Sequence, residues 1–259
     1  IEHAKSNADI EHPAVKGVLQ YLNITEGLEI HHDGDLPART GLGSSSSFTV
    51  GLLNALYAMQ HRMATKSELA HAAIHVEQNI LQESVGCQDQ VLAAHGGFCR
   101  LTFSQTGDIG YTPLIIKPER LQAFHDHLLL YFTGFSRTAS EIAKEQIEKT
   151  KHRRVELFAM LQMVQEGISI LTGNHDLAEF GELLHEAWMV KRGLTGKIST
   201  PLIDQIYDAA RGAGALGGKL LGAGGGGFML IYAKPELHAR INAALPGLLR
   251  VPFQFDGSG

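Results

Sequence analysis

The order in which strand-like and helix-like segments follow one another constrains the fold of this chain most. Four short runs in the first half are apolar or alternate between apolar and polar residues, which indicates strands: "GLEIHHD", "GFCRLTF", "GYTPLIIK" and "HLLLYFTG". Four helical patterns then follow one another, over residues 136–150, 153–171, 174–191 and 201–213. Because strands and helices do not alternate strictly, the pattern favours an α+β fold over a doubly wound parallel sheet.

The composition changes between Pro118 and Asp126, where a mixed first half meets a helix-rich second half. We therefore predict two domains, residues 1–120 and 121–259. Further helices are expected over 13–22, 44–59, 66–81 and 235–245, two short strands around the glycine turn of "GGKLLGAGGGGFMLIYA", and a last strand in "LRVPFQF". The chain does not open with methionine, and we expect that the beginning of its first domain is missing.

Charge and hydropathy exclude several classes of protein. The formal net charge is -5, whereas a general nucleic-acid binder would carry a basic face. No apolar run is long enough to cross a bilayer, and no secretory signal opens the chain. Cys87 and Cys99 are the only cysteines, which is typical of a reduced cytoplasmic protein. We expect a cytoplasmic protein that binds neither nucleic acid nor membranes, and the sequence indicates no oligomeric state.

The segment "GLGSSSS" stands directly before a run of helix-forming apolar residues. The first amides of a helix lack intrahelical partners, and the helix dipole is positive there. Glycine lets a phosphate approach the backbone closely, and the serine hydroxyls add donors or metal ligands. A helix capped by serine after a flexible turn is the alternative. We assign phosphate binding to Gly41, Leu42, Gly43, Ser44, Ser45, Ser46 and Ser47.

Neither of the two common phosphate-binding loops is present. The nearest approach to a Walker A loop is "AGALGGKL", which has Ala213 in the first glycine position and Leu220 in the hydroxyl position. The segment "GAGGGG", from Gly222 to Gly227, has the spacing of a dinucleotide-binding loop but precedes a strand-like run, "FMLIYA". A dinucleotide-dependent oxidoreductase is therefore a poor alternative.

Two carboxylates follow the serine-rich segment in "HVEQNILQESVGCQDQ". Phosphoryl transfer to a hydroxyl needs charge neutralisation, usually by magnesium, and often a carboxylate near the attacking oxygen. Glu77 on the second helix and Asp89 after the "SVG" turn are the candidates, with Glu83 as a competitor for the metal. The alternatives are a solvated helix residue for Glu77 and a helix N-cap for Asp89. His71 and His75 stand four residues apart on one helix, where an exposed face explains them better than a metal site.

Two of these segments resemble signatures of the GHMP kinases, the superfamily of galactokinase, homoserine kinase and mevalonate kinase. The segment "LPARTGLGSSSS" is similar to the second signature, and "KLLGAGGGGFML" to the third. The first signature is absent, which agrees with a missing beginning. The resemblance implies an N-terminal domain like domain 2 of ribosomal protein S5 and a ferredoxin-like C-terminal domain, with nucleotide and sugar in the cleft between them.

Within that superfamily, "GCQDQ", "TGFSRTASEI" and "FGELLHEAW" make the chain similar to the bacterial D-glycero-D-manno-heptose 7-phosphate kinases. This resemblance implies ATP and Mg2+ as cofactors and a sugar phosphate as substrate. It also implies that Ser45 and Glu77 ligate magnesium and that Asp89 accepts or orients the proton of the sugar hydroxyl. We assign Gly224 and Gly225 of the glycine turn to the substrate site.

Arg137 lies at the start of a predicted helix, where it could grip the phosphate that such a substrate already carries, although a surface ion pair explains it equally well. Two other functions stay open. The chain could be another sugar kinase of the superfamily, similar to a fucokinase or a galactokinase. It could also be a sensor that binds nucleotide and sugar without turnover.

Overall fold

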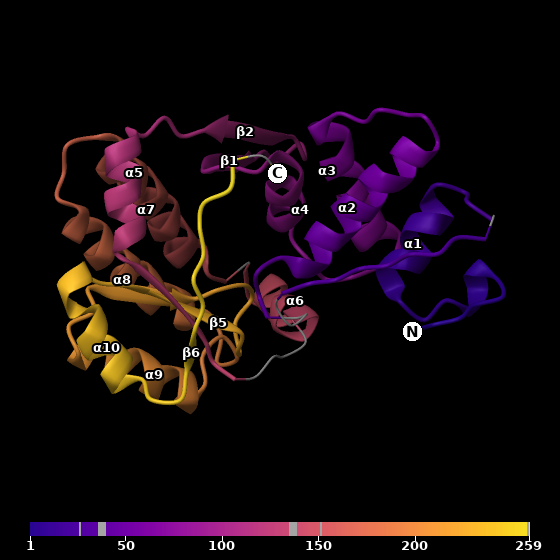
Figure 1. Ribbon diagram of the computed structural model, residues 1–259. Helices are drawn as coiled ribbons and strands as arrows, with labels where there is room; N and C mark the ends of the chain where they lie inside the picture. Colours follow the sequence, from indigo (N-terminus) through magenta and orange to yellow (C-terminus); the bar gives the residue numbers. More distant parts are fainter. Residues whose placement is uncertain (26, 36–39, 135–138, 151, 258) are drawn as a thin grey trace. The chain divides into compact units, whose positions relative to one another are not determined.

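The computed structural model describes residues 1–25, 27–35, 40–134, 139–150, 152–257 and 259, and only the backbone of residues 139–141. The chain forms two compact units (Figure 1). The first comprises residues 1–39, 43–98 and 256–259, and the second comprises residues 40–42 and 99–255. These units divide the chain earlier than the domain boundary predicted between residues 120 and 121, which stays a prediction.

The described part of the first unit is helical. It contains a short 3-10 helix (Asn7–Asp9), α1 (Pro13–Tyr21), α2 (Ser44–Met59), α3 (Lys66–His75), a π-helix (Val76–Ile80) and α4 (Gln88–His95). Val18 of α1, Leu53 of α2 and Ala73 of α3 are fully buried and form its core. Helices α1 and α2 are confirmed at or close to their predicted limits. The predicted helix over 66–81 changes type along its length, because its last turn is a π-turn.

The strand predicted for "GLEIHHD" is wrong. Residues 27–33 form no regular element, and Leu28 and Ile30 are each 37% exposed. A strand is stabilised by backbone hydrogen bonds to a neighbouring strand. No described strand pairs with this segment, so its alternating pattern has no sheet to join.

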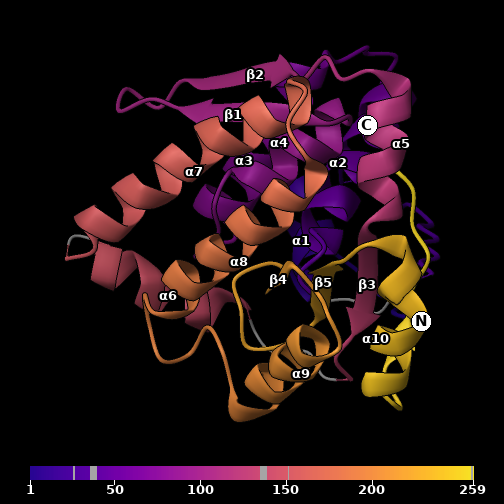
Figure 2. The same ribbon diagram turned by 90° about the vertical axis from the view of Figure 1, so that its left-hand side faces the viewer.

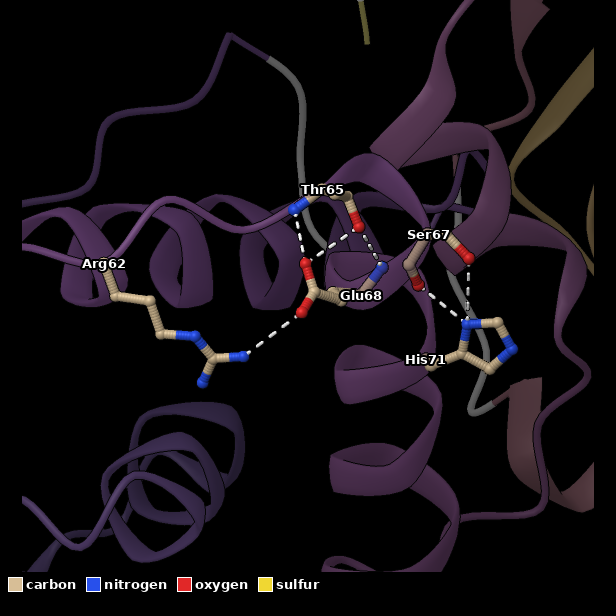
Figure 3. A network of polar contacts seen from close by, with 5 residues as sticks. All are labelled: Arg62, Thr65, Ser67, Glu68 and His71. Carbon is tan, nitrogen blue, oxygen red and sulfur yellow. Dashed lines mark hydrogen bonds and ion pairs between the residues drawn. The ribbon is translucent and has the colours of Figure 1, made fainter.

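Helix α3 begins with a network of local polar contacts (Figure 3). Thr65 is the N-cap, and its hydroxyl accepts from the Glu68 amide at 3.2 Å. The Glu68 carboxylate in turn accepts from the Thr65 amide at 2.7 Å, which completes a capping box. This bond and the Thr65 hydroxyl bond lower the Glu68 pKa. The exposed helix face predicted for His71 is confirmed, with its ring bonded to the Ser67 carbonyl at 2.7 Å.

The second unit is built on an antiparallel sheet of β3 (Leu128–Phe132), β4 (Gly217–Leu220), β5 (Phe228–Tyr232) and β6 (Leu249–Arg250), in the order β4-β5-β3-β6. Helices separate β3 from β4, a hairpin joins β4 to β5, and α10 (His238–Ala244) leads to β6. This connectivity is that of the ferredoxin-like fold, as predicted. Strand β6 is shorter than predicted, because Pro252 has no amide to extend the ladder beyond the bond from Val251 to Leu130.

Both faces of this sheet are covered (Figure 2). Tyr131 and Met229 pair across β3 and β5 on the face that packs against α9 (Pro201–Gly212) and α10. On the other face, Tyr232 packs against Phe124 of α5 (Pro118–Asp126) and Phe180 of α8 (Leu177–Arg192). The remaining elements are α6 (Ala139–Thr150), α7 (Arg154–Thr172), a 3-10 helix (Pro235–Leu237) and the hairpin of β1 (Cys99–Phe103) and β2 (Ile109–Pro113).

Among the described residues, no helix combines the length and the apolar character that a membrane span requires.

Candidate active site

Helix α2 begins at a left-handed glycine. Gly43 is the N-cap with φ 71° and ψ 18°, and the first helical hydrogen bond runs from the Ser47 amide to the Gly43 carbonyl at 2.9 Å. Within the described part of the chain, no side chain or carbonyl accepts from the amides of Ser44, Ser45 and Ser46. Three free amides at the positive end of a helix form a ready site for an anionic group such as phosphate.

Asp89 lies beside this helix start. A Cβ added to Gly43 would stand 3.3 Å from both Cβ and Cγ of Asp89, so only glycine leaves ordinary space between the two residues. The N-cap of α4 is Cys87, and Asp89 lies in the first turn, so the N-cap alternative for Asp89 is wrong. Asp89 makes no hydrogen bond or ion pair with any residue that the structure describes. Its side chain reaches solvent, but the protein atoms packed around the carboxylate raise its pKa.

Glu77 is a buried carboxylate, only 1% exposed, so the alternative of a solvated helix residue is wrong. Its Oε2 accepts a hydrogen bond from the Ser46 hydroxyl at 3.1 Å and a short one from the Gln90 side-chain amide. Its Oε1 is buried and has no partner among the described residues. Burial raises the Glu77 pKa, and the hydrogen bonds from Gln90 and Ser46 oppose this increase.

The backbone around Glu77 is a π-turn. The Leu81 amide bonds to the Val76 carbonyl at 2.9 Å, five residues back, and the Glu83 amide bonds to the Glu77 carbonyl at 2.9 Å. A π-turn inserts an extra residue into a helix and is found frequently at functional sites. The irregularity starts one residue before Glu77 and therefore sets where this carboxylate lies.

The structure brings Ser46, and not Ser45, to Glu77. The Ser45 side chain is exposed, and its carbonyl accepts from the Thr49 hydroxyl at 3.1 Å. Ser44 is half-buried and Ser47 is exposed. The pairing of Ser45 with Glu77 at a metal stays a prediction.

The residues around Glu77 fit a magnesium ion in their chemistry. Carboxylate, amide and hydroxyl oxygens are the ligands that Mg2+ takes, usually with one or two carboxylates and several oxygens from phosphates or water. Among the described residues, two buried side-chain oxygens have no donor, Glu77 Oε1 and Gln90 Oε1. Across the described residues, no three His, Cys, Asp or Glu side chains gather into a metal cluster of their own. A magnesium ion here would therefore draw most of its ligands from the nucleotide and from water.

Sequence reasoning did not identify Gln90. The residue occupies a buried position of α4, beside Val91 and on the same side as Ala94. A glutamine at a core-facing helix position needs a polar partner. A polar residue type at an apolar position of the helix pattern was therefore the signal that could have identified Gln90.

The glycine-rich turn belongs to the second unit, and so does the segment of residues 40–42. A Cβ on Gly41 would stand 2.9 Å from the Leu221 carbonyl oxygen, and one on Gly227 would stand 2.1 Å from the Thr40 carbonyl oxygen. Both glycines have positive φ. They are needed because two backbone segments pack against each other without intervening side chains.

The two glycines assigned to substrate have partners inside the second unit. The Gly225 amide donates to the Ile198 carbonyl at 2.9 Å, and a Cβ on Gly224 would stand 2.8 Å from the Ile198 Cα. These contacts give both residues a packing role, and their assignment to substrate binding stays a prediction. Arg137, and Pro37 of the signature segment, lie outside the described residues, so the assignment of Arg137 to the substrate phosphate also stays a prediction.

Two family models match the chain. The model described as "GHMP kinases N terminal domain" matches residues 10–97, and "GHMP kinases C terminal" matches residues 168–245. Together they cover more than half of the sequence. The chain therefore belongs to the GHMP kinase family, and the resemblance inferred from its signature segments is confirmed.

Individual relatives agree with this family. The chain is 30% identical over 218 residues to D-glycero-alpha-D-manno-heptose 7-phosphate kinase of Campylobacter jejuni, which covers 83% of this chain and 64% of that protein. It is 28% identical over 214 residues to mevalonate kinase of Pyrococcus furiosus, covering 80% of this chain and 60% of the relative. The chain thus spans less than two thirds of the length of these two relatives.

A solved structure shows the same fold. The crystal structure of a D-glycero-D-manno-heptose 1-phosphate kinase from Bacteroides thetaiotaomicron matches with a TM-score of 0.69 at 27% identity, covering 96% of this chain and 73% of that one. The predicted two-domain GHMP kinase fold is confirmed.

Proposed function

We propose that the protein is an ATP-dependent sugar kinase that phosphorylates the anomeric hydroxyl of D-glycero-D-manno-heptose 7-phosphate. The product would be heptose 1,7-bisphosphate, a precursor of nucleotide-activated heptose for surface polysaccharide. The observation that carries the proposal is the start of α2, where free amides adjoin one unpartnered carboxylate, Asp89, and one buried carboxylate, Glu77. The choice of sugar is supported by the heptose 7-phosphate kinase relative and by the segments "GCQDQ" and "FGELLHEAW".

The free amides of Ser44, Ser45 and Ser46 would hold phosphate oxygens of ATP. Magnesium, when bound, would neutralise charge on the phosphates, and Glu77 is the residue that would hold it, with a serine hydroxyl of the same turn. The sugar hydroxyl would attack the γ-phosphorus in line, its proton would pass to Asp89, and ADP would leave. The pKa of Asp89 is raised and therefore lies closer to neutral pH. A general base works best when its pKa is near the pH of the reaction. No phosphoenzyme is needed.

An ADP-release assay over a panel of acceptors tests this proposal. The panel contains the heptose 7-phosphate, the free heptose, L-fucose, galactose and mevalonate. Turnover is expected with the heptose 7-phosphate above all others. Preference for a different acceptor would move the protein to another kinase of the family, and binding of nucleotide and sugar without ADP release would make it a sensor.

Asp89→Asn separates chemistry from binding. The variant should bind a non-hydrolysable ATP analogue with nearly unchanged affinity and lose about 10²–10⁴-fold in kcat, the usual contribution of a general base. Glu83→Gln is the comparison variant, because Glu83 is the neighbouring carboxylate that the sequence offered as a competitor for the metal, and it should stay active if Glu77 holds the metal. Normal turnover of Asp89→Asn would show that another group takes the proton.

A further inference from the structure

Gln90 contacts the carboxylate of Glu77 from the element that carries Asp89. Its Nε2 donates to Glu77 Oε2, and both side chains are 1% exposed. The opposite amide orientation would place the Gln90 carbonyl oxygen against the carboxylate, and two oxygens without a proton between them repel each other. The amide orientation is therefore set by its partner, and the Gln90 carbonyl oxygen is the atom left over.

The Gln90 carbonyl oxygen is one of two neighbouring buried oxygens that lack a hydrogen-bond donor among the described residues. The other is Glu77 Oε1, although the buried Thr49 hydroxyl lies near enough to Glu77 to help lower its pKa. Buried polar groups in native proteins are nearly always satisfied, and an unsatisfied acceptor carries a free-energy cost of about 1–3 kcal/mol. Two such acceptors on neighbouring side chains indicate that a positively charged or hydrogen-donating group completes the site when the protein works.

We propose that Gln90 is a positioning residue for the metal-binding carboxylate. Together with the Ser46 hydroxyl it holds Glu77 Oε2, which leaves Oε1 as the oxygen that faces a divalent cation. With a cation bound, the Gln90 carbonyl would be free to accept a hydrogen bond from water that the cation holds. This inference rests on the proposed function, since it concerns the metal of the same site.

The position of Gln90 in the chain extends this role. Asp89 and Gln90 are consecutive residues in the first turn of α4. One rigid turn therefore carries the base and also the side chain that orients the metal ligand. The spacing between proton acceptor and metal carboxylate is then fixed by the hydrogen bond that links α4 to the π-helix within the first unit.

Gln90→Met tests the proposal, because methionine is similar in volume but cannot donate to Glu77. Its matched control is Gln78→Met. Gln78 lies in the π-helix and donates to the Val85 carbonyl at 2.9 Å, and none of its hydrogen bonds reach Glu77. The probe is Mn2+ alone, titrated into nucleotide-free protein and followed by electron paramagnetic resonance. Kinetic titration with Mg2+ at saturating ATP is the second measurement.

We expect the Mn2+ dissociation constant, and the Mg2+ concentration for half-maximal rate, to rise about 10–100-fold in Gln90→Met, as for residues that orient a metal ligand. The kcat at saturating Mg2+ should change much less, which is the reverse of Asp89→Asn. Gln78→Met should bind Mn2+ like the wild type. Equal Mn2+ affinity in Gln90→Met and Gln78→Met would overturn the proposal.

Ser46→Ala serves if Gln90→Met does not fold, because it removes the other donor to Glu77 Oε2. The expected change has the same direction, and unchanged Mn2+ affinity would again refute the inference. Failure of the proposed function gives a different result, since the wild type would then release no ADP with any acceptor in the panel.

Discussion

Two glycines of α2 provide a matched test of how the phosphate site is built. Gly43 is left-handed with φ 71°, and an added Cβ would stand 3.3 Å from the Asp89 Cβ. Gly51 lies inside the same helix, is exposed, and would place an added Cβ in open space. The same substitution, glycine to alanine, should therefore have opposite effects on stability at the two positions.

The magnitudes follow from the geometry. Alanine at Gly43 costs about 1–2 kcal/mol for the left-handed backbone, and the tight contact with Asp89 adds up to about 1 kcal/mol. Alanine at Gly51 stabilises the helix by about 1 kcal/mol. The free energies of unfolding of the two variants should differ by about 2–4 kcal/mol, which corresponds to roughly 8–32 °C in the melting temperature of a unit of about 100 residues such as the first unit.

Circular dichroism at 222 nm follows the helices of both units, so a transition that it shows and that tryptophan fluorescence does not show belongs to the first unit. The only tryptophan, Trp188, lies in the second unit, so its fluorescence reports separately on that unit. Calorimetric titration with a non-hydrolysable ATP analogue completes the test. Gly43→Ala should weaken binding, and Gly51→Ala should not.

Two outcomes would refute the reasoning. If Gly43→Ala were as stable as Gly51→Ala, the left-handed start of α2 would be wrong. If Gly43→Ala were destabilised but bound the analogue with unchanged affinity, the phosphates would not rest on the amides that follow Gly43.

Three further predictions concern the rest of the molecule. Thr65→Ala removes the capping box with Glu68 and should lower the free energy of unfolding by about 1 kcal/mol in a denaturant titration. An unchanged free energy of unfolding would show that Thr65 does not cap α3. Gly227→Ala places a Cβ 2.1 Å from the Thr40 carbonyl oxygen at φ 103°, so no folded second unit should be recovered, and a folded variant would contradict this packing. Burial, with Lys219 nearby, lowers the Lys191 pKa from about 10.5 to about 8. Protonated Lys191 therefore lowers the stability of the folded protein at neutral pH, and this loss of stability disappears as the pH rises from about 8 to about 10.5. Amine acylation followed by mass spectrometry should give a midpoint near pH 8 for Lys191, and a midpoint near pH 10 would contradict this environment.

Local signals in the sequence predicted the start of α2 correctly, whereas α4 and α5 were not predicted and α8 begins three residues later than predicted. The change from "GLG" to serines and then to a 3.6-residue apolar pattern placed the start of α2 at Ser44, where the structure has it. The start of α3 is equally local, because its N-cap Thr65 and its capping-box partner Glu68 are three residues apart. In both places the determining contacts lie within a few residues of one another, so the sequence contains the whole argument.

Contacts between distant segments could not be predicted in this way. Glu77 and Gln90 are thirteen residues apart, and their hydrogen bond depends on the π-turn between them. Which serine faces Glu77 depends on the rotation of α2 about its axis, which packing against α3 and α4 sets. A shift of one residue, from Ser45 to Ser46, is a rotation of about 100° on a helix, and composition alone does not resolve it.

The two glycine-rich segments differ in whether their backbone amides already have acceptors. Both were predicted to bind ligands, because glycine exposes backbone amides in either context. In the turn of the second unit the Gly225 amide is already bonded to Ile198, and Lys191 donates to the Gly222 carbonyl at 2.7 Å. The amides that follow Gly43 have no acceptor among the described residues. The glycines of the turn serve close backbone packing, whereas Gly43 leaves hydrogen-bonding capacity unused, and only unused amides can contribute binding free energy to a phosphate.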